Sequence, residues 1–313
     1  MPKTHKPRAG SLQFWPRKRA KKQTARVRAW STKITEPKLL GFIGYKVGMT
    51  HLHAIVQNPN VKKKEEEVFP TTIIECPPLK PFSLRFYQKT LTGLKPVSEI
   101  LAKKLDKELK RKIKFPKKQK DTIPESFDEL RLVVYTQPKL TSLGKKKPEI
   151  AEIKLSTNDI NYAKSLLEKD INIQDIFQEH QYIDIHTVTK GKGNQGPVKR
   201  FGISLKSHKS EKGRRAPGSL GNWNAKTWRV AHAGQTGYHL RTEYNKQILK
   251  ISTNPKEITP KQGFHQYGLI KNTFILIKGQ VAGPKKRAIT LTFPLRNKTA
   301  YPFNITSIKN ENI

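Results

Sequence analysis

The chain has few acidic residues. Its 313 residues include 24 Asp and Glu against 62 Lys and Arg, which gives a formal net charge of +38. So large an excess of one sign opposes compaction of the isolated chain, because the cations repel one another. The composition therefore predicts a permanent polyanionic partner, and nucleic acid is the first candidate.

Cysteine and long apolar runs are also scarce. The single cysteine, Cys76, excludes an internal disulfide, which is typical of a reducing compartment, and we expect its thiol to be buried and inert. No apolar run approaches the roughly 18–20 residues that a membrane span requires. We therefore expect a soluble, intracellular protein without a membrane partner.

One segment resembles a cofactor-binding motif. Residues 191–196 read GKGNQG and fit the G-x-G-x-x-G dinucleotide fingerprint. Residues 197–202 do not predict an amphipathic helix, however, and no βαβ unit with a ribose-binding acid follows. We interpret the segment as a tight turn that presents Lys190, Lys192, Lys199 and Arg200 to phosphate.

Catalytic and metal-binding signals are absent. His51 and His53 would share one face of a strand, but no cysteine or acid at ligand spacing accompanies them. No nucleophile elbow, P-loop or H-E-x-x-H motif is present, and the carboxylates lie in charge-balanced stretches such as residues 65–67. We expect no enzyme activity, no metal, no cofactor and no small-molecule substrate.

The N-terminus is basic and poor in apolar residues. Residues 1–30 hold ten Lys and Arg and no acid, and Pro2, Pro7, Gly10 and Pro16 interrupt any helix. We predict a basic N-terminal arm over residues 1–36, which would be disordered by itself.

Short apolar runs separated by glycine and proline predict a mainly β fold. We expect strand and turn over residues 38–57 and further strands over residues 68–75, 182–189, 201–205, 273–278 and 288–293. The strands at the two ends of the chain resemble one another. We therefore predict a single β-barrel built from residues 37–79 and 181–313.

Residues 80–180 have a mixed character and predict an inserted α/β domain. Strands are expected over residues 84–90 and 130–135 and short helices over residues 158–168 and 172–178, with Asn158 and Asn172 as N-caps. The clearest helix is expected over a stretch with apolar side chains at helical spacing, namely Val97, Ile100, Leu101, Leu105 and Leu109. Ser98 is placed to cap its start.

A long, glycine-rich finger is predicted over about residues 206–239. Residues 186–241 hold twelve Lys and Arg against one acid, Glu211. Trp223 and Trp228 lie among these cations, where an unpaired base could stack on each ring for about 1–3 kcal/mol. The alternative is that both rings pack on the barrel and the loop is merely solvated.

Several motifs, in order along nearly the whole chain, resemble those of large-subunit ribosomal protein L3, in its archaeal and eukaryotic form. They are PRAGSL at 7–12, PRKRA at 16–20, GFIGYKVGMTH at 41–51, VTKGKG at 188–193, GQTGYHLRTE at 234–243, Asn245-Lys246 and GPKKRAITL at 283–291. The resemblance implies a translation-factor-like β-barrel with an α/β insertion, seated on large-subunit ribosomal RNA beside neighbouring ribosomal proteins in the cytoplasmic ribosome. It also implies a structural and assembly role, with a finger that approaches the peptidyl transferase centre and carries Trp223 near its tip.

The candidate RNA-binding residues lie in three segments. The arm contributes Arg8, Arg17, Lys18, Arg19, Lys21, Lys22, Arg26 and Arg28. The finger and its base contribute Lys190, Lys192, Lys199, Arg200, His208, Lys209, Lys212, Arg214, Arg215, Trp223, Trp228, Arg229, His239 and Arg241. A basic turn contributes Lys285, Lys286 and Arg287. Charge alone also allows a DNA-compacting basic protein, which is the alternative function.

Overall fold

The computed structural model describes residues 14–57, 65–116, 122–218, 230–296 and 298–309. The chain divides into two compact units. Unit 1 comprises Met1–Lys22 and Val188–Leu240, and unit 2 comprises Gln23–Thr187 and Arg241–Ile313. No helix in the described part of the chain is long and apolar enough to cross a membrane.

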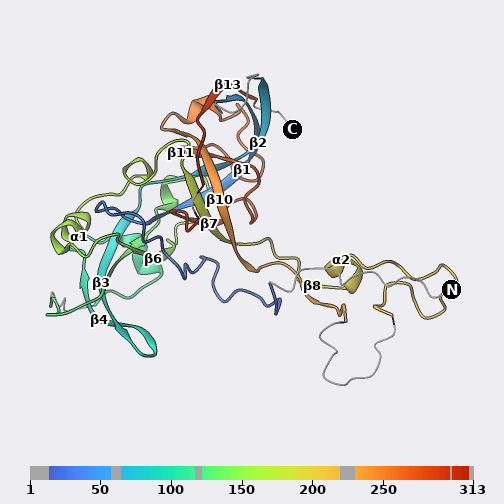
Figure 1. The fold of residues 1–313 in the computed structure, drawn as a ribbon, viewed down its shortest axis with the longest axis horizontal. Helices are drawn as coiled ribbons and strands as arrows, with labels where there is room; N and C mark the ends of the chain where they lie inside the picture. Colours follow the sequence, from blue (N-terminus) through green and yellow to red (C-terminus); the bar gives the residue numbers. More distant parts are fainter. Residues whose placement is uncertain (1–13, 58–64, 117–121, 219–229, 297, 310–313) are drawn as a thin grey trace. The chain divides into compact units, whose positions relative to one another are not determined.

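Unit 2 is built on a large antiparallel sheet that closes on itself (Figure 1). Its strand order is β12 (Ala288–Thr292), β7 (Tyr182–Val188), β10 (Leu240–Ser252), β11 (Phe274–Lys278), β2 (Glu66–Glu75), β1 (Gly41–Val56) and β13 (Phe303–Lys309). The first half of β1 also pairs with β12, so six strands form a closed ring. β13 pairs with the second half of β1.

Two glycines allow β1 to lie close to its neighbours. A Cβ atom on Gly44 would lie 2.6 Å from the Ile74 side chain and 2.9 Å from the Cys76 sulfur, and one on Gly41 would lie 2.7 Å from the Leu291 carbonyl oxygen. Real Cβ atoms do not approach other atoms so closely, so these positions require glycine. The glycines between the apolar runs thus serve the packing of the ring.

A second, four-stranded sheet has the order β4 (Gly93–Leu101), β3 (Lys80–Thr90), β5 (Glu129–Tyr135) and β6 (Ile150–Lys154). Its side chains Leu84 and Leu132 share one hydrophobic core with Ile43 of the ring. The helices of unit 2 are short: α1 (Ile160–Leu166) and the 3-10 helices η1 (Lys107–Arg111), η2 (Pro138–Leu140), η3 (Ile173–Asp175) and η5 (Pro255–Glu257). The fold is therefore mainly β, as the sequence predicts.

The helix predicted from Val97 to Leu109 is wrong. Val97 to Leu101 belong to strand β4, and only the 3-10 helix η1 follows. Ile100 packs into the main core, whereas Leu101, Leu105 and Leu109 pack in a smaller cluster with Phe82, Val133 and Tyr135. Neighbouring residues of a strand point to opposite faces, so apolar side chains at helical spacing here serve two separate clusters.

The other local predictions have mixed outcomes. Strands β1, β2, β3, β5, β7, β11 and β12 confirm the predicted strand segments to within a few residues, and Pro77-Pro78 follows β2. The strand predicted over residues 201–205 is wrong, because Phe201 ends helix α2 (Pro197–Phe201).

The helix predicted over 158–168 is α1, and its N-cap is Asp159 instead of Asn158. Of the helix predicted over 172–178, only the 3-10 helix η3 (Ile173–Asp175) forms; Asn172 is at its N-cap position, and the Asp175 carboxylate accepts from the Asn172 N–H (3.1 Å).

A fully buried carboxylate joins β2 to the loop before β11. Glu75 has no exposed surface and accepts four hydrogen bonds: from the Tyr267 hydroxyl (2.5 Å), the backbone N–H groups of Lys271 (2.9 Å) and Asn272 (3.0 Å), and the Asn272 side-chain amide (2.8 Å). Burial, followed by the charge of Glu75, raises the pKa of the Tyr267 hydroxyl. Four uncharged donors together replace the hydration of one carboxylate, so Glu75 organises the loop through hydrogen bonds to neutral groups.

We expect Glu75→Ala to lower the free energy of unfolding by at least about 3 kcal/mol, because it leaves several buried donors without an acceptor. Equilibrium denaturation of the purified chain measures the change. Glu67→Ala, at an exposed position of the same strand, is the control and should change stability by less than about 0.5 kcal/mol. Equal losses in the two variants would contradict this role of Glu75.

Candidate nucleic-acid interface

Unit 1 contains a paired stem at the base of the predicted finger. The N–H of Thr189 donates to the carbonyl of His239 (2.9 Å), that of Lys192 to Thr236 (3.0 Å), and that of Thr236 to Gly193 (2.8 Å). The short strands β8 (Asn194–Gln195) and β9 (Gly234–Gln235) extend the ladder. The segment that resembles a dinucleotide fingerprint is therefore one side of an antiparallel stem.

A tight turn and a buried histidine close this stem. Gly237 has a φ of +74°, and a Cβ atom there would lie 2.1 Å from the carbonyl oxygen of Lys190, so only glycine fits. His239 is 8% exposed; its Nε2 accepts from the Gly237 N–H (3.1 Å), and its Nδ1 lies 2.9 Å from the Lys18 carbonyl oxygen. A carbonyl only accepts, so Nδ1 carries the hydrogen and the imidazole is neutral.

Part of the N-terminal arm is held by this stem. The Ala20 N–H donates to the Tyr238 carbonyl (2.8 Å), and the Arg17 guanidinium donates to the Arg200 carbonyl (3.0 Å). Arg17 also lies 4.4 Å from the centre of the Phe201 ring, where a cation–π contact forms. Arg17 and Ala20 therefore have partners on the stem within unit 1, and the disorder of the isolated arm stays a prediction.

Arg200 links helix α2 to the returning side of the finger. It lies on α2, and its guanidinium donates to the carbonyl oxygen of His232 (2.9 Å). Burial, followed by repulsion from Arg17, lowers the pKa of Arg200. Pro197 starts and Gly202, with a φ of +66°, ends a single helical turn, which is too short to be the amphipathic helix of a dinucleotide-binding unit. This five-residue helix leads into no βαβ unit, because the neighbouring strands β8 and β9 are antiparallel.

Most of the remaining cations of unit 1 are exposed around this frame. Its described residues hold fourteen Lys and Arg and one carboxylate, Glu211. A hollow of about 570 Å³ is lined by Arg19, Ala20, Lys21 and Tyr238. It places an aromatic side chain beside two cations, the combination that a stacked base and its phosphates require. Tyr238 is not among the candidates predicted from the sequence, although it is an aromatic residue in the basic segment like Trp223.

The basic turn in unit 2 is anchored by a buried lysine. The Lys46 ammonium of β1 donates to the carbonyl oxygens of Val281 and Gly283, the latter at 3.2 Å. Burial lowers the pKa of Lys46; nearby Glu243 opposes this shift, and nearby Lys285 adds to it. The backbone of the turn is also fixed, because the Lys286 N–H donates to the Lys46 carbonyl (2.8 Å). β1 thereby holds the GPKKR segment in place.

The predicted RNA-binding residues thus fall into distinct groups. Exposed side chains are Lys18, Arg19, Lys21, Lys22, Arg26, Arg28, Lys190, Lys192, Lys199, His208, Lys209, Lys212, Arg214, Arg215 and Lys286. Half-buried ones are Arg17, Arg200, Arg241 and Lys285, and buried ones are His239 and Arg287. Arg8, Trp223, Trp228 and Arg229 lie outside the described residues.

Comparison with known proteins identifies the family. The family model described as "Ribosomal protein L3" matches residues 1–126 and 118–304. The chain belongs to the ribosomal protein L3 family. "Large ribosomal subunit protein uL3" of Methanocaldococcus jannaschii is 46% identical over 309 residues, covering 93% of this chain and 92% of the relative. The proteins of the same name from Methanococcus aeolicus and Archaeoglobus fulgidus are 44% and 43% identical, over 94% and 96% of this chain and 93% and 95% of their own lengths.

The family assignment agrees with the chemistry of the described residues. As a ribosomal protein of the L3 family, the chain is not an enzyme. His51 and His53 lie on β1, and among the residues that the structure describes no group of three or more His, Cys, Asp or Glu side chains could hold a metal.

We expect His239→Ala to loosen the contact between the arm and the stem, because it removes both the donor to Lys18 and the acceptor for Gly237. If the free energy of local opening falls by about 1.4 kcal/mol, which is within the range for one such hydrogen bond, amide hydrogen exchange at the contact should become tenfold faster. Hydrogen exchange at the Ala20 amide, which bonds to Tyr238, reports it. His208→Ala, at an exposed position, should leave that amide unchanged; faster exchange in both variants, or in neither, would contradict the assignment.

Proposed function

We propose that this L3-family chain is a structural constituent of the large ribosomal subunit, in the cytoplasmic ribosome, that binds large-subunit ribosomal RNA and supports assembly of the particle. The observation that carries the proposal is the composition of unit 1, where fourteen described cations accompany one carboxylate. Most of these side chains are exposed on a frame held together by backbone pairing. RNA phosphates supply the missing negative charge.

The proposal assigns contacts to the exposed cations. Lys190, Lys192 and Lys199 along the stem and Arg19 and Lys21 at the hollow bind phosphates, while Tyr238 offers a ring to a base. Arg17, Arg200, His239 and Arg287 act indirectly, by keeping the stem and the basic turn in shape. Trp223, outside the described residues, is proposed as the tip residue of a finger over residues 206–239 that approaches the peptidyl transferase centre.

The remaining parts of the proposal concern architecture. We infer that the closed sheet is a translation-factor-like β-barrel formed by residues 37–79 and 181–313, that residues 80–180 form an inserted α/β domain, and that residues 1–36 form the arm. The closed ring of six strands and the separate four-stranded sheet support this division. Neighbouring large-subunit ribosomal proteins are the proposed protein partners, and neither a membrane nor a small-molecule substrate is involved.

Salt dependence tests the proposed mode of RNA binding. If about ten phosphates are neutralised, the logarithm of affinity for a ribosomal RNA fragment should fall with the logarithm of salt concentration at a slope near −7. A triple variant in which Lys190, Lys192 and Lys199 are each replaced by Gln should give a shallower slope, less negative by about 2. Filter binding at several salt concentrations measures both values.

The control replaces the exposed lysines Lys103, Lys104 and Lys107 of unit 2 with Gln, which removes the same charge. If this control lowers the slope as much as the stem variant does, binding depends on net charge and not on the stem. A slope near zero in the unaltered chain would remove the electrostatic basis of the proposal altogether.

A DNA-compacting basic protein is the alternative that charge alone allows. Competition between a ribosomal RNA fragment and duplex DNA of equal phosphate content distinguishes the two functions. We expect the RNA fragment to win at physiological salt, because unpaired bases are accessible to Tyr238 and the finger, whereas bases in a duplex are stacked. Equal competition by the duplex would favour the alternative.

A further inference from the structure

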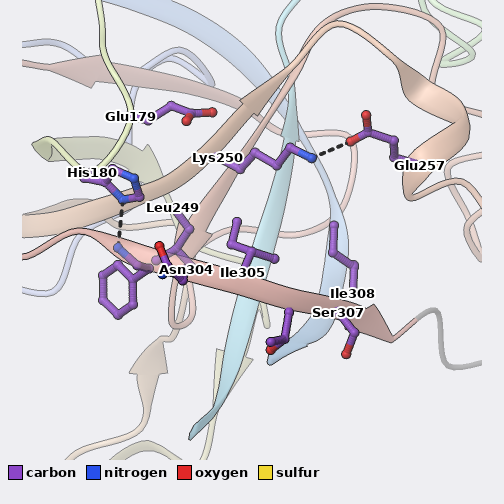
Figure 2. Close-up of a pocket in the computed structure, with 11 residues that line it drawn as sticks. Glu179, His180, Leu249, Lys250, Glu257, Asn304, Ile305, Ser307 and Ile308 are labelled. Carbon is purple, nitrogen blue, oxygen red and sulfur yellow. Dashed lines mark hydrogen bonds and ion pairs between the residues drawn. The ribbon is translucent and has the colours of Figure 1, made fainter. Parts of the chain in front are cut away.

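A hollow of about 590 Å³ in unit 2 does not belong to the basic surface described above (Figure 2). It is lined by residues 303–308 of β13, by Leu249 and Lys250 of β10, and by Glu179, His180 and Glu257. Leu249 is buried, and Ile305 and Ile308 of β13 are half-buried members of the main core. The hollow therefore combines an apolar floor with a polar rim.

The sheet is incomplete at this hollow. Within the described residues β13 pairs with β1 alone, so alternate N–H and C=O groups on its second edge face away from any strand. On the β10 side, the Ile251 N–H donates to the Glu179 carboxylate (2.8 Å), and the Phe303 N–H of β13 lies 3.4 Å from Nδ1 of His180. Side chains thus take the place of a neighbouring strand at single positions.

The charge of the hollow is opposite to that of the chain. Its lining contains two carboxylates, Glu179 and Glu257, and one lysine, Lys250, whereas the whole chain has 62 basic and 24 acidic residues. Lys250 is already engaged, because its ammonium lies 2.7 Å from the Glu257 carboxylate (Figure 2). The charges of Lys250 and Glu257 cancel within this ion pair, which leaves Glu179 and a net charge of −1 on the lining, so this surface disfavours a phosphate and favours a cationic ligand.

We propose that the second edge of β13 binds an extended segment of another polypeptide, rich in Lys and Arg, which adds a strand to the sheet. Its backbone would pair with β13, its apolar side chains would cover Ile305 and Ile308, and its cations would lie near Glu179 and Glu257. The inference rests on the proposed function in one respect, since a large ribonucleoprotein particle supplies neighbouring proteins with basic extensions.

Hydrogen exchange of the full-length chain with three probes tests this docking site. The probes are a decapeptide of alternating Lys and Val, one of alternating Glu and Val, and decauridylate RNA. We expect the Lys-Val peptide alone to slow exchange of the amides in residues 303–308, by about tenfold at saturation. Absence of protection, equal protection by the Glu-Val peptide, or protection of this edge by decauridylate would each overturn the proposal.

A matched pair of variants tests the role of charge. Glu179→Gln with Glu257→Gln keeps the hydrogen-bond acceptors but removes both negative charges, and we expect affinity for the Lys-Val peptide to fall about fivefold at low salt. Glu168→Gln with Asp170→Asn, at exposed positions of the same unit, should leave it unchanged. Equal affinities in the two double variants would overturn the proposed charge complementarity.

Binding of ribosomal RNA is measured on the same variants and should not change. If the unaltered chain fails to bind ribosomal RNA but the Lys-Val peptide still protects β13, the proposed function fails and the docking site stands. If the unaltered chain binds ribosomal RNA but the Lys-Val peptide gives β13 no protection, the docking site fails and the proposed function stands.

Discussion

The uneven distribution of carboxylates along the chain determines how each unit holds itself together. Of the 24 Asp and Glu residues, 23 fall within the sequence of unit 2, and Glu211 alone falls within unit 1. Unit 2 uses its carboxylates structurally: Glu75 gathers four donors, and Glu149 lies 3.0 Å from the Lys112 ammonium. Unit 1 has no such supply, so its shape depends on backbone pairing, tight turns and aromatic contacts.

Because unit 1 has so few carboxylates, its structural cations are held by uncharged groups, and its other cations are mostly exposed. Arg17 and Arg200 each donate from one guanidinium nitrogen to a backbone carbonyl, and such a bond does not cancel the charge of the side chain. His239 is kept neutral between the Gly237 N–H and the Lys18 carbonyl. The stem is consequently stabilised without reducing the electric field around it, and the exposed lysines remain available to a polyanion.

The sequence pattern predicts a strand correctly where apolar β-branched residues form a continuous buried run. It does not predict structure that depends on contacts between residues far apart in the chain. The apolar β-branched runs of β11 and β12 were predicted as strands. Strand β10 was not, because only Gln247 to Leu249 and Ser252 are buried and Asn245, with a φ of +53°, interrupts the alternation. The family motifs located the basic segments, but no pattern could indicate that His239 is buried against Lys18, since that contact joins residues far apart in sequence.

The three partners of β1 explain why a gap remains in an otherwise closed sheet. β1 has sixteen residues, and β12 covers only Gly41 to Tyr45. β13 covers His51 to Val56 with a register shift between His53 and Ala54, where the Thr306 hydroxyl donates to the His53 carbonyl (3.1 Å). The ring is therefore closed through β12 at one end of β1, whereas at the other end β13 pairs with no second strand among the residues that the structure describes. Closure by a strand from another polypeptide would complete the hydrogen bonding that this chain leaves unfinished, and the carboxylates at the rim would restrict that strand to a basic one.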